Sequence, residues 1–263
     1  MYYLNSGAWC NLTKQNLEKL QVSQMKFLKR ILHTPRSTPN VAVQIEMGVI
    51  PISYEIHIRQ LNYLHHILSF EQYDPVRMVY NQQKLFKFEK NWYNEVKPLL
   101  EKYKLELDED EIRNTEKETW KKVVNKQVYS FVAKELNTRC SQGKMTSMFP
   151  CRTEVQMKEY MRKMTPSDAR LLFAIRSKTI DLRGVRTYMY EEATCRLCEQ
   201  GIEDIDHILN TCIHVTRTKT TFSEMEILGD DIQISKEVVT RMKQFITKVE
   251  DIVSSESNRT TAE

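Results

Sequence analysis

Three cysteines and one histidine lie close together in the sequence, at spacings that suit a single metal ion. Cys195 and Cys198 form a C-x2-C pair, eight residues separate Cys198 from His207, and four separate His207 from Cys212. Thiolate sulfur and imidazole nitrogen are ligands that Zn²⁺ prefers, and a C-x2-C turn holds two sulfurs close enough to share one ion. Four protein ligands fill the tetrahedron. The pattern therefore predicts a structural zinc site with no open position for catalysis.

The two ligand pairs need different elements to position them. Residues 205–209 are predicted to form a short helix that turns His207 inward. Cys212 lies five residues further, about 140° around an ideal helix, so we expect the helix to fray or turn before it. His214 is a weaker candidate for the fourth ligand, because it lengthens the second pair. The alternative, four ordinary core residues that meet by chance, stays open.

The remainder of the chain is typical of a mainly α-helical protein. Six Gly and seven Pro in 263 residues are too few for the turns of a many-stranded fold. Thr165 with Pro166, and Asp108, have the residue types of helix starts. Pro98 should kink or end its helix. Helices are expected at about residues 13–32, 39–47, 51–70, 75–84, 86–102, 109–139, 153–164, 166–179 and 235–253, with an extended stretch at 184–190.

Charge is unevenly distributed although the net charge is only +4. Residues 12–36 hold six basic side chains against one acidic, and residues 158–186 hold eight against three, whereas residues 101–118 hold eight acidic against four basic. Basic faces attract phosphate by counterion release. The alternative is that these are solvated helix faces. The candidate nucleic-acid contacts are Lys26, Lys29, Arg30, Arg170, Arg176, Arg183, Arg186, Tyr188, Arg196, Arg217 and Lys219.

Aromatic residues beside the predicted metal site allow two interpretations. Tyr188 and Tyr190 precede the C-x2-C pair and lie close to Arg186. Aromatic side chains next to arginine suit single-stranded nucleic acid, where bases stack and phosphates pair. Equally, both tyrosines could be strand residues that pack on the metal-binding segment.

The cysteine pattern and the hydropathy indicate where the protein works. Three of the six cysteines have metal-ligand spacing and do not form a disulfide framework, which indicates a reducing compartment. The sequence shows neither a secretion signal nor an apolar run of roughly 20 residues. We therefore expect a nuclear or cytoplasmic protein that is neither secreted nor embedded in a membrane.

Several short motifs in order resemble the region that follows the polymerase in non-LTR (LINE-type) retrotransposon reverse transcriptases. The motifs are MYYLNSGAW at residues 1–9 with LTK at 12–14 and LE at 17–18, FLKRIL at 27–32, STP at 37–39, EMGVIP at 46–51, RQLNYL at 59–64, and ARLLFAIR at 169–176 followed by the C-C-H-C pattern. The resemblance extends to about Cys212.

The resemblance implies an architecture and a function. It implies a thumb-like helical region followed by a knuckle that engages RNA or DNA. Together with the helix pattern, this divides the chain into a thumb-like helical region at 1–72, a helical linker region with basic helices at 73–190, a CCHC zinc knuckle at 191–215, a C-terminal helical segment at 216–253 and a disordered tail at 254–263. Such a fragment would hold template RNA or target DNA, with the upstream polymerase domain as a possible partner.

Catalysis is not expected from this chain alone. The family's Tyr-x-Asp-Asp hairpin and any nuclease domain are absent from the sequence. Polymerases need paired carboxylates for two metal ions, but Asp108/Asp110 and Asp230/Asp231 are interpreted as caps or loop residues. Two alternatives are a zinc-stapled protein-interaction domain, with the acidic residues 101–118 as its surface, and a subunit that works only with a separate polymerase palm.

Overall fold

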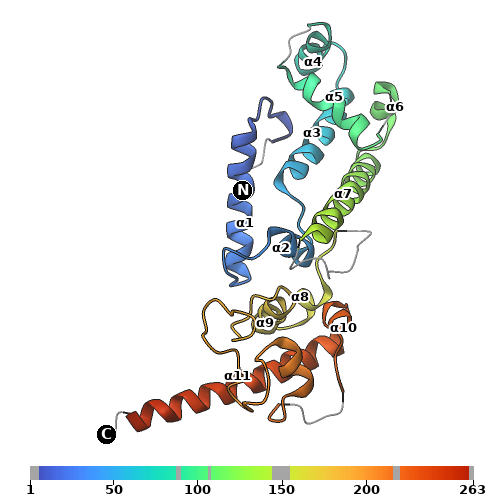
Figure 1. The fold of residues 1–263 in the computed structure, drawn as a ribbon. Coiled ribbons are helices and arrows are strands. Elements are labelled where there is room, and N and C mark those ends of the chain that lie inside the picture. The colour runs from blue at the N-terminus through green and yellow to red at the C-terminus, as the bar shows by residue number, and fades with distance from the viewer. Residues whose placement is uncertain (1–5, 87–89, 106–107, 144–154, 216–219, 261–263) are drawn as a thin grey trace. The chain divides into compact units, whose positions relative to one another are not determined.

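The computed structural model describes residues 6–86, 90–105, 108–143, 155–215 and 220–260, with side chains to residue 255 (Figure 1). The fold is mainly α, as predicted. Within the described ranges, the only β-type pairing is an isolated antiparallel bridge between Thr194 and Ile202. Long-range order in this chain therefore comes from helix packing and from ordered loops.

The chain forms two compact units that are not consecutive in sequence. Unit 1 contains residues 1–27, 48–138 and 152–155, and unit 2 contains residues 28–47, 139–151 and 156–263. The segments expected from the sequence are consecutive, so they do not anticipate that residues 28–47 belong to the C-terminal unit. This assignment brings the end of the first basic segment into the unit that carries the cysteines.

Unit 1 is built around α3, which packs against η1, α5, α6 and α4. Leu61 and Leu68 of α3 are fully buried, and the indole N–H of Trp120 donates to the Leu61 carbonyl over 3.1 Å. The Trp92 indole N–H donates to the carbonyl of Gly7 over 2.7 Å. The elements are η1 (Ser6–Ala8), α1 (Lys14–Ile31, ending in unit 2), α3 (Ile52–Ser69), α4 (Pro75–Leu85), α5 (Trp92–Lys102), α6 (Glu109–Asn114) and α7 (Lys117–Gln142, ending in unit 2).

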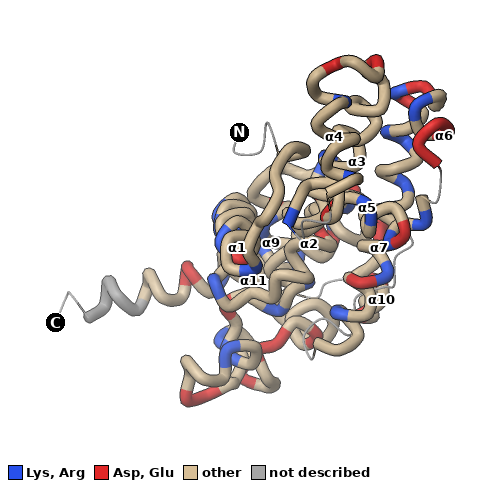
Figure 2. Tube along the Cα trace, turned by 90° about the horizontal axis from the view of Figure 1, so that it is seen from above, with Lys and Arg blue, Asp and Glu red and all other residues tan. Residues whose placement is uncertain are grey.

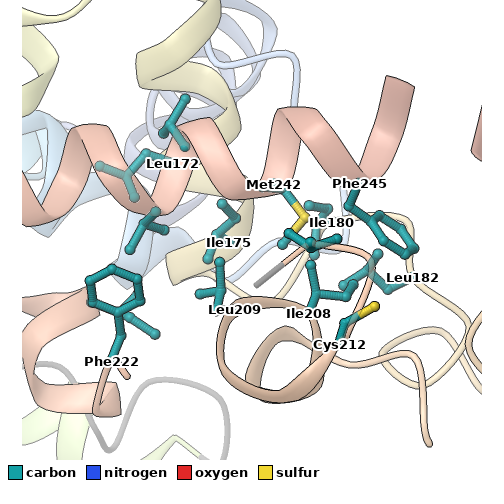
Figure 3. Packing of buried hydrophobic residues seen from close by; sticks show 14 of the residues in the cluster. Leu172, Ile175, Ile180, Leu182, Ile208, Leu209, Cys212, Phe222, Met242 and Phe245 are labelled. Carbon is teal, nitrogen blue, oxygen red and sulfur yellow. The ribbon is translucent and has the colours of Figure 1, made fainter. Parts of the chain in front are cut away.

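Unit 2 surrounds one apolar core that includes two of the cysteines. Its elements are the end of α1, α2 (Asn40–Met47), α8 (Glu159–Lys163), α9 (Pro166–Arg176), η2 (His207–Thr211), α10 (Glu224–Leu228) and α11 (Ile232–Thr260). Figure 3 shows Met242 and Phe245 of α11 facing Ile208, Leu209 and Cys212. All five side chains are buried. The segment of the predicted metal site is thus part of the core of this unit.

Predicted helix starts agree with the observed caps. The Asp108 carboxylate accepts from the Glu111 amide over 2.8 Å, and the Glu111 side chain returns the bond to the Asp108 amide. The acidic first turn of α6 stands out in red in Figure 2. Thr165 accepts from the Asp168 amide in the same way. These carboxyl groups and hydroxyls satisfy amides that have no partner within the helix.

Other expectations about the helices were wrong. The helix expected over residues 109–139 is divided into α6 and α7, because Thr115 has an extended backbone (φ −73°, ψ 133°). Of the two outcomes expected at Pro98, a kink or an end of the helix, the end is not observed, because Pro98 lies inside α5. Residues 184–190 form turns, not an extended stretch. The last helix, α11, begins at Ile232 and continues to Thr260, where a disordered tail was expected from Ser254.

Candidate metal centre and basic surface

The four predicted ligands come together in unit 2. One ligand atom from each of Cys195, Cys198, His207 and Cys212 lies within 4.8 Å of the others, so the group could hold a metal ion. The Cys198 Sγ and His207 Nε2 atoms are 3.1 Å apart. Cys195 and Cys212 are buried, whereas Cys198 and His207 are partly exposed. Two ligands therefore anchor the centre in the core, and two lie nearer to solvent.

A tight turn holds the C-x2-C pair. The Cys195 amide donates to the Gly201 carbonyl over 2.8 Å, and the Glu199 amide donates to the Cys195 carbonyl over 3.0 Å. Glu199 has a positive φ of 54°, the left-handed conformation that closes such turns. The backbone amides of residues 197 and 198 also donate hydrogen bonds to the Cys195 sulfur. Amides directed at sulfur stabilise the thiolate that a metal ion requires.

The second ligand pair is joined by one turn of π-helix, η2. The Cys212 amide donates to the carbonyl of His207, five residues earlier, over 2.7 Å. A wider i→i+5 turn brings residues five apart to the same side, which an α-helix would not do. As expected, the helix ends before Cys212, whose backbone is extended; the π-type widening that precedes this end was not predicted. At its start, Asp204 Oδ1 accepts from the His207 amide over 2.8 Å.

Burial is the largest influence on the pKa values of the Cys195 and Cys212 thiols. Burial raises the pKa of the Cys195 thiol, although the amides of residues 197 and 198 oppose the shift. Burial also raises the pKa of Cys212 to about 12, with the neighbouring cysteines adding to the effect. At neutral pH both groups are therefore protonated thiols, and a metal ion that binds them must displace their protons.

His214, the alternative fourth ligand, is not among the four residues of the cluster. The residue is exposed. Its backbone is used instead: the His214 amide donates to the Cys212 sulfur, and its carbonyl accepts from the Lys248 ammonium over 2.5 Å. His214 thus supports the centre through its main chain and links it to α11.

A buried carboxylate, which the sequence analysis missed, organises the loops around the metal centre. Glu203 is 0% exposed and accepts from the backbone amides of Arg183 and Arg196 over 3.1 and 3.0 Å. The Arg196 guanidinium adds hydrogen bonds of 2.5 to 3.1 Å to both carboxylate oxygens. Burial alone would raise the pKa of Glu203, but these hydrogen bonds outweigh it and lower the pKa. Arg196, predicted as a nucleic-acid contact, is thus engaged in an internal ion pair.

Arg176 is not a surface residue, so its prediction as a nucleic-acid contact was wrong. Its side chain is 0% exposed and pairs with Glu46, whose carboxylate is equally buried, over 3.0 Å. The guanidinium also donates to the carbonyls of residues 227, 228 and 229 over 2.6 to 2.9 Å. Arg176 therefore ties α2 and the end of α10 to α9.

The end of the first basic segment meets the second one in unit 2, where the C-terminal end of α1 contacts α9 and the loop that follows α9. The Arg170 Nε–H donates to the Ile31 carbonyl over 2.8 Å, and the Thr34 and Thr179 hydroxyls are 3.4 Å apart. The Arg186 guanidinium donates to the Thr179 carbonyl over 2.8 Å. We call the basic residues at the end of α1, on α9 and in the loops that follow these two helices the basic surface. Its members are Lys29, Arg30, Arg36, Arg170, Lys178 and Arg186.

The basic surface holds few acidic residues. Lys178 pairs with Glu224 over 2.9 Å, and Arg186 lies 3.8 Å from Asp181. The Lys29 ammonium donates to the Arg36 carbonyl, and burial lowers the pKa of Lys29. The last turn of a helix carries partial negative charge, which favours Lys29 and Arg30 at the end of α1.

The remaining predicted contacts are dispersed. Lys26 is exposed on α1, in the part assigned to unit 1, and the Arg183 side chain is partly exposed. Tyr188 is 81% exposed, so it is not a strand residue packed on the metal-binding segment. The Tyr190 hydroxyl donates to Asp181 over 3.0 Å. Arg217 and Lys219 lie outside the described residues.

No protein-family model matches the chain, and neither a curated protein nor a solved structure matches it. Across the described part of the chain, every helix is too short or too polar to cross a lipid bilayer. Interpretation of the site therefore depends on its own geometry and chemistry.

Proposed function

We propose that this chain is a nucleic-acid-binding module, stapled by zinc and non-catalytic by itself, that corresponds to the C-terminal part of a non-LTR reverse transcriptase polyprotein. In this role it holds template RNA or target DNA beside a separate polymerase domain. The observation that carries the proposal is the meeting of two distant basic segments in the unit that also contains the metal-ligand cluster.

The donor set supports zinc as the metal ion. Three thiols and one imidazole converge, and this combination occurs in closed tetrahedral zinc sites. Cys195, Cys198, His207 and Cys212 would hold the ion, and Cys195 and Cys212 would connect it to the apolar core. A bound ion would supply structure: apparent zinc-binding free energies in finger peptides are about 10–16 kcal/mol, enough to fold such a segment.

Phosphate binding is the role proposed for the basic surface. The six cationic side chains lie at the end of α1, on α9 and in the loops that follow these helices, and only Glu224 and Asp181 pair with them among the described residues. A strand that contacts them releases condensed counterions, so binding should weaken steeply as salt rises.

The proposal is tested by the salt dependence of RNA binding. We expect the zinc-loaded chain to bind a fluorescent single-stranded RNA, measured by anisotropy between low and physiological salt. Replacing Arg30, Arg36 and Arg170 together by alanine should lower the slope of log affinity against log salt by about 2, because each phosphate that is neutralised on a single strand contributes about 0.7 to the slope.

A matched control removes three charges elsewhere. Lys122, Lys126 and Lys134 are exposed on α7 in unit 1, and their replacement by alanine changes the net charge equally. The control should leave the slope close to that of the unchanged protein. Equal slopes for both triple variants, or no binding at low salt, would contradict the proposal.

A second candidate function, a zinc-stapled protein-interaction domain, is favoured by one observation in unit 1. Large apolar side chains are exposed on and next to α4, including Tyr73 at 89% and Leu85 at 81%. Exposed apolar patches often mark protein contacts. The acidic segment suits this role less well, because Glu109 is engaged by Lys84 and Tyr80. A protein complex that is abolished in Leu85→Ser while RNA affinity is unchanged would favour this function.

A further inference from the structure

The two ring nitrogens of His207 have different neighbours. Nε2 is 3.1 Å from the Cys198 sulfur, inside the ligand cluster. Nδ1 is 2.9 Å from the Thr211 hydroxyl oxygen, which lies one turn further along η2. The same hydroxyl oxygen is 3.3 Å from the His207 carbonyl. A hydroxyl has one proton, so while it donates to the carbonyl it accepts at Nδ1.

We propose that Thr211 is a positioning residue for the metal ion. By accepting a hydrogen bond from Nδ1–H, it fixes the tautomer of His207 in which Nε2 carries the free lone pair and acts as the ligand atom. This inference rests on the proposed metal site and goes beyond it, because it assigns the ligand nitrogen and the group that orients it. Outer-shell partners of this kind commonly change metal affinity 10- to 100-fold.

Gly201 lies close against the His207 ring. A Cβ atom at residue 201 would lie 2.8 Å from His207 Nδ1 and 2.9 Å from Cε1, closer than such contacts allow. The Gly201 carbonyl meanwhile accepts from the Cys195 amide, so this backbone is fixed by the first ligand turn. Both Thr211 and the Gly201 backbone therefore restrict the imidazole near Nδ1. An added methyl group would have to displace the ring or the turn.

The π-turn explains why Thr211 can serve this purpose. Its hydroxyl reaches both Nδ1 and the carbonyl of His207, while the next residue, Cys212, donates its amide to that same carbonyl. One carbonyl thus organises both the fourth ligand and the residue that orients the third. Thr211 is exposed, so water can partly replace its hydroxyl. The effect of removing the hydroxyl should lie near the lower end of the range, at about 10-fold.

The experiment measures zinc affinity by competition with a chromophoric chelator, in the full chain, for Thr211→Val and Thr211→Ser. The valine variant keeps the branched shape without the hydroxyl, and should bind zinc about 10-fold more weakly. The serine variant keeps the hydroxyl and should bind within about twofold of the unchanged protein. Thr247→Val, at an exposed position on α11, is the control for substitution by valine and should have no effect.

A spectroscopic readout separates positioning from general destabilisation. Long-range ¹H–¹⁵N correlations of the zinc-loaded protein should show His207 with a protonated Nδ1 and a metal-bound Nε2. The inference would be overturned by a metal-bound Nδ1, or by equal zinc affinities for the valine and serine variants. Neither result would contradict the proposed metal site itself. An unchanged protein that binds no zinc would overturn the proposed function itself, and this inference with it.

Discussion

Replacing Arg176 by methionine should destabilise unit 2 strongly, although the sequence suggests a surface base. The substitution keeps a long apolar side chain and removes every donor that Arg176 provides. Glu46 then stays buried without its partner, and the carbonyls of residues 227 to 229 no longer receive their hydrogen bonds. Arg170→Met is the matched control, since Arg170 is partly exposed and donates one hydrogen bond to the Ile31 carbonyl.

The magnitude follows from the burial of the pair. Both side chains are 0% exposed, and removing one partner of such a pair typically costs about 3–5 kcal/mol because a charge is left uncompensated. The control should cost about 1 kcal/mol, the net contribution of a single hydrogen bond. Because a whole domain is stable by only about 5–15 kcal/mol, the Arg176 variant should be close to unfolding in unit 2.

The assay must report on unit 2 separately. Trp9, Trp92 and Trp120 all lie in unit 1, so tryptophan fluorescence follows that unit. Hydrogen exchange measured by mass spectrometry on peptides from α2 and from residues 224–230 follows the surroundings of Arg176. We expect these peptides to lose protection in Arg176→Met and to keep it in Arg170→Met.

The control variant, which should stay folded, should nevertheless show a change in RNA binding. Arg170→Met should lower RNA affinity without unfolding the protein, because Arg170 belongs to the basic surface. A destabilisation of less than about 1 kcal/mol in Arg176→Met, with full protection of α2, would refute the reasoning, since one unsatisfied buried group alone costs that much.

Three further perturbations test other parts of the structure. Burial, and secondly Lys102, lower the pKa of His57 to about 4 from the usual 6.5. The folded state therefore holds the neutral imidazole, and stability that is complete above pH 6.5 should fall as pH drops toward 4, by at most about 3 kcal/mol. Urea titrations followed by tryptophan fluorescence at two pH values, with His57→Gln as reference, check this. Glu203→Gln should destabilise unit 2 by about 2 kcal/mol, because hydrogen bonds to charged groups contribute about 1.5–3 kcal/mol. Calorimetry with and without zinc should detect this loss. An unchanged melting temperature would argue against the role of Glu203. Asp108→Ala should cost about 1 kcal/mol by removing the cap of α6, measured in the same urea titrations, and unchanged stability would show that the cap is dispensable.

The convergence of the four candidate metal ligands could be predicted from the sequence because their spacing reflects local geometry. A C-x2-C turn and a histidine on a short helix constrain the chain over a few residues, and the four side chains do converge. The π-turn could not be predicted. Apolar periodicity does not distinguish an i→i+4 from an i→i+5 hydrogen bond, and here the register is set by Cys212 and His207.

Arg176 illustrates the limit of charge counting. A base in the last turn of a helix is usually explained by the helix dipole and by solvent. The signal that could have identified it is its spacing: Arg176 lies four residues after Leu172, on the buried stripe of α9. Its partner Glu46 lies between Ile45 and Met47 in a largely buried helix. Only their long-range ion pair shows why both charged side chains can be buried.

The assembly of the basic surface from distant segments could not be predicted from the sequence either. Residues 28–47 fold with the C-terminal unit, and this placement follows from contacts such as Arg170 to Ile31 and the Lys158 amide to the Glu46 carbonyl. Each of these contacts joins residues more than a hundred positions apart. Local helix signals at Asp108 and Thr165 were reliable because the hydrogen bonds involved span three residues.

The most direct measurement is the zinc content of the purified chain by native mass spectrometry, before and after chelation, with hydrogen exchange followed in parallel. We expect one zinc ion per chain, and its removal should expose residues 193–215 and the part of α11 that packs on Ile208 and Leu209. A well-folded chain that carries no metal, keeps the same protection after chelation and reacts with alkylating reagent at the partly exposed Cys198 would contradict the zinc-stapled module.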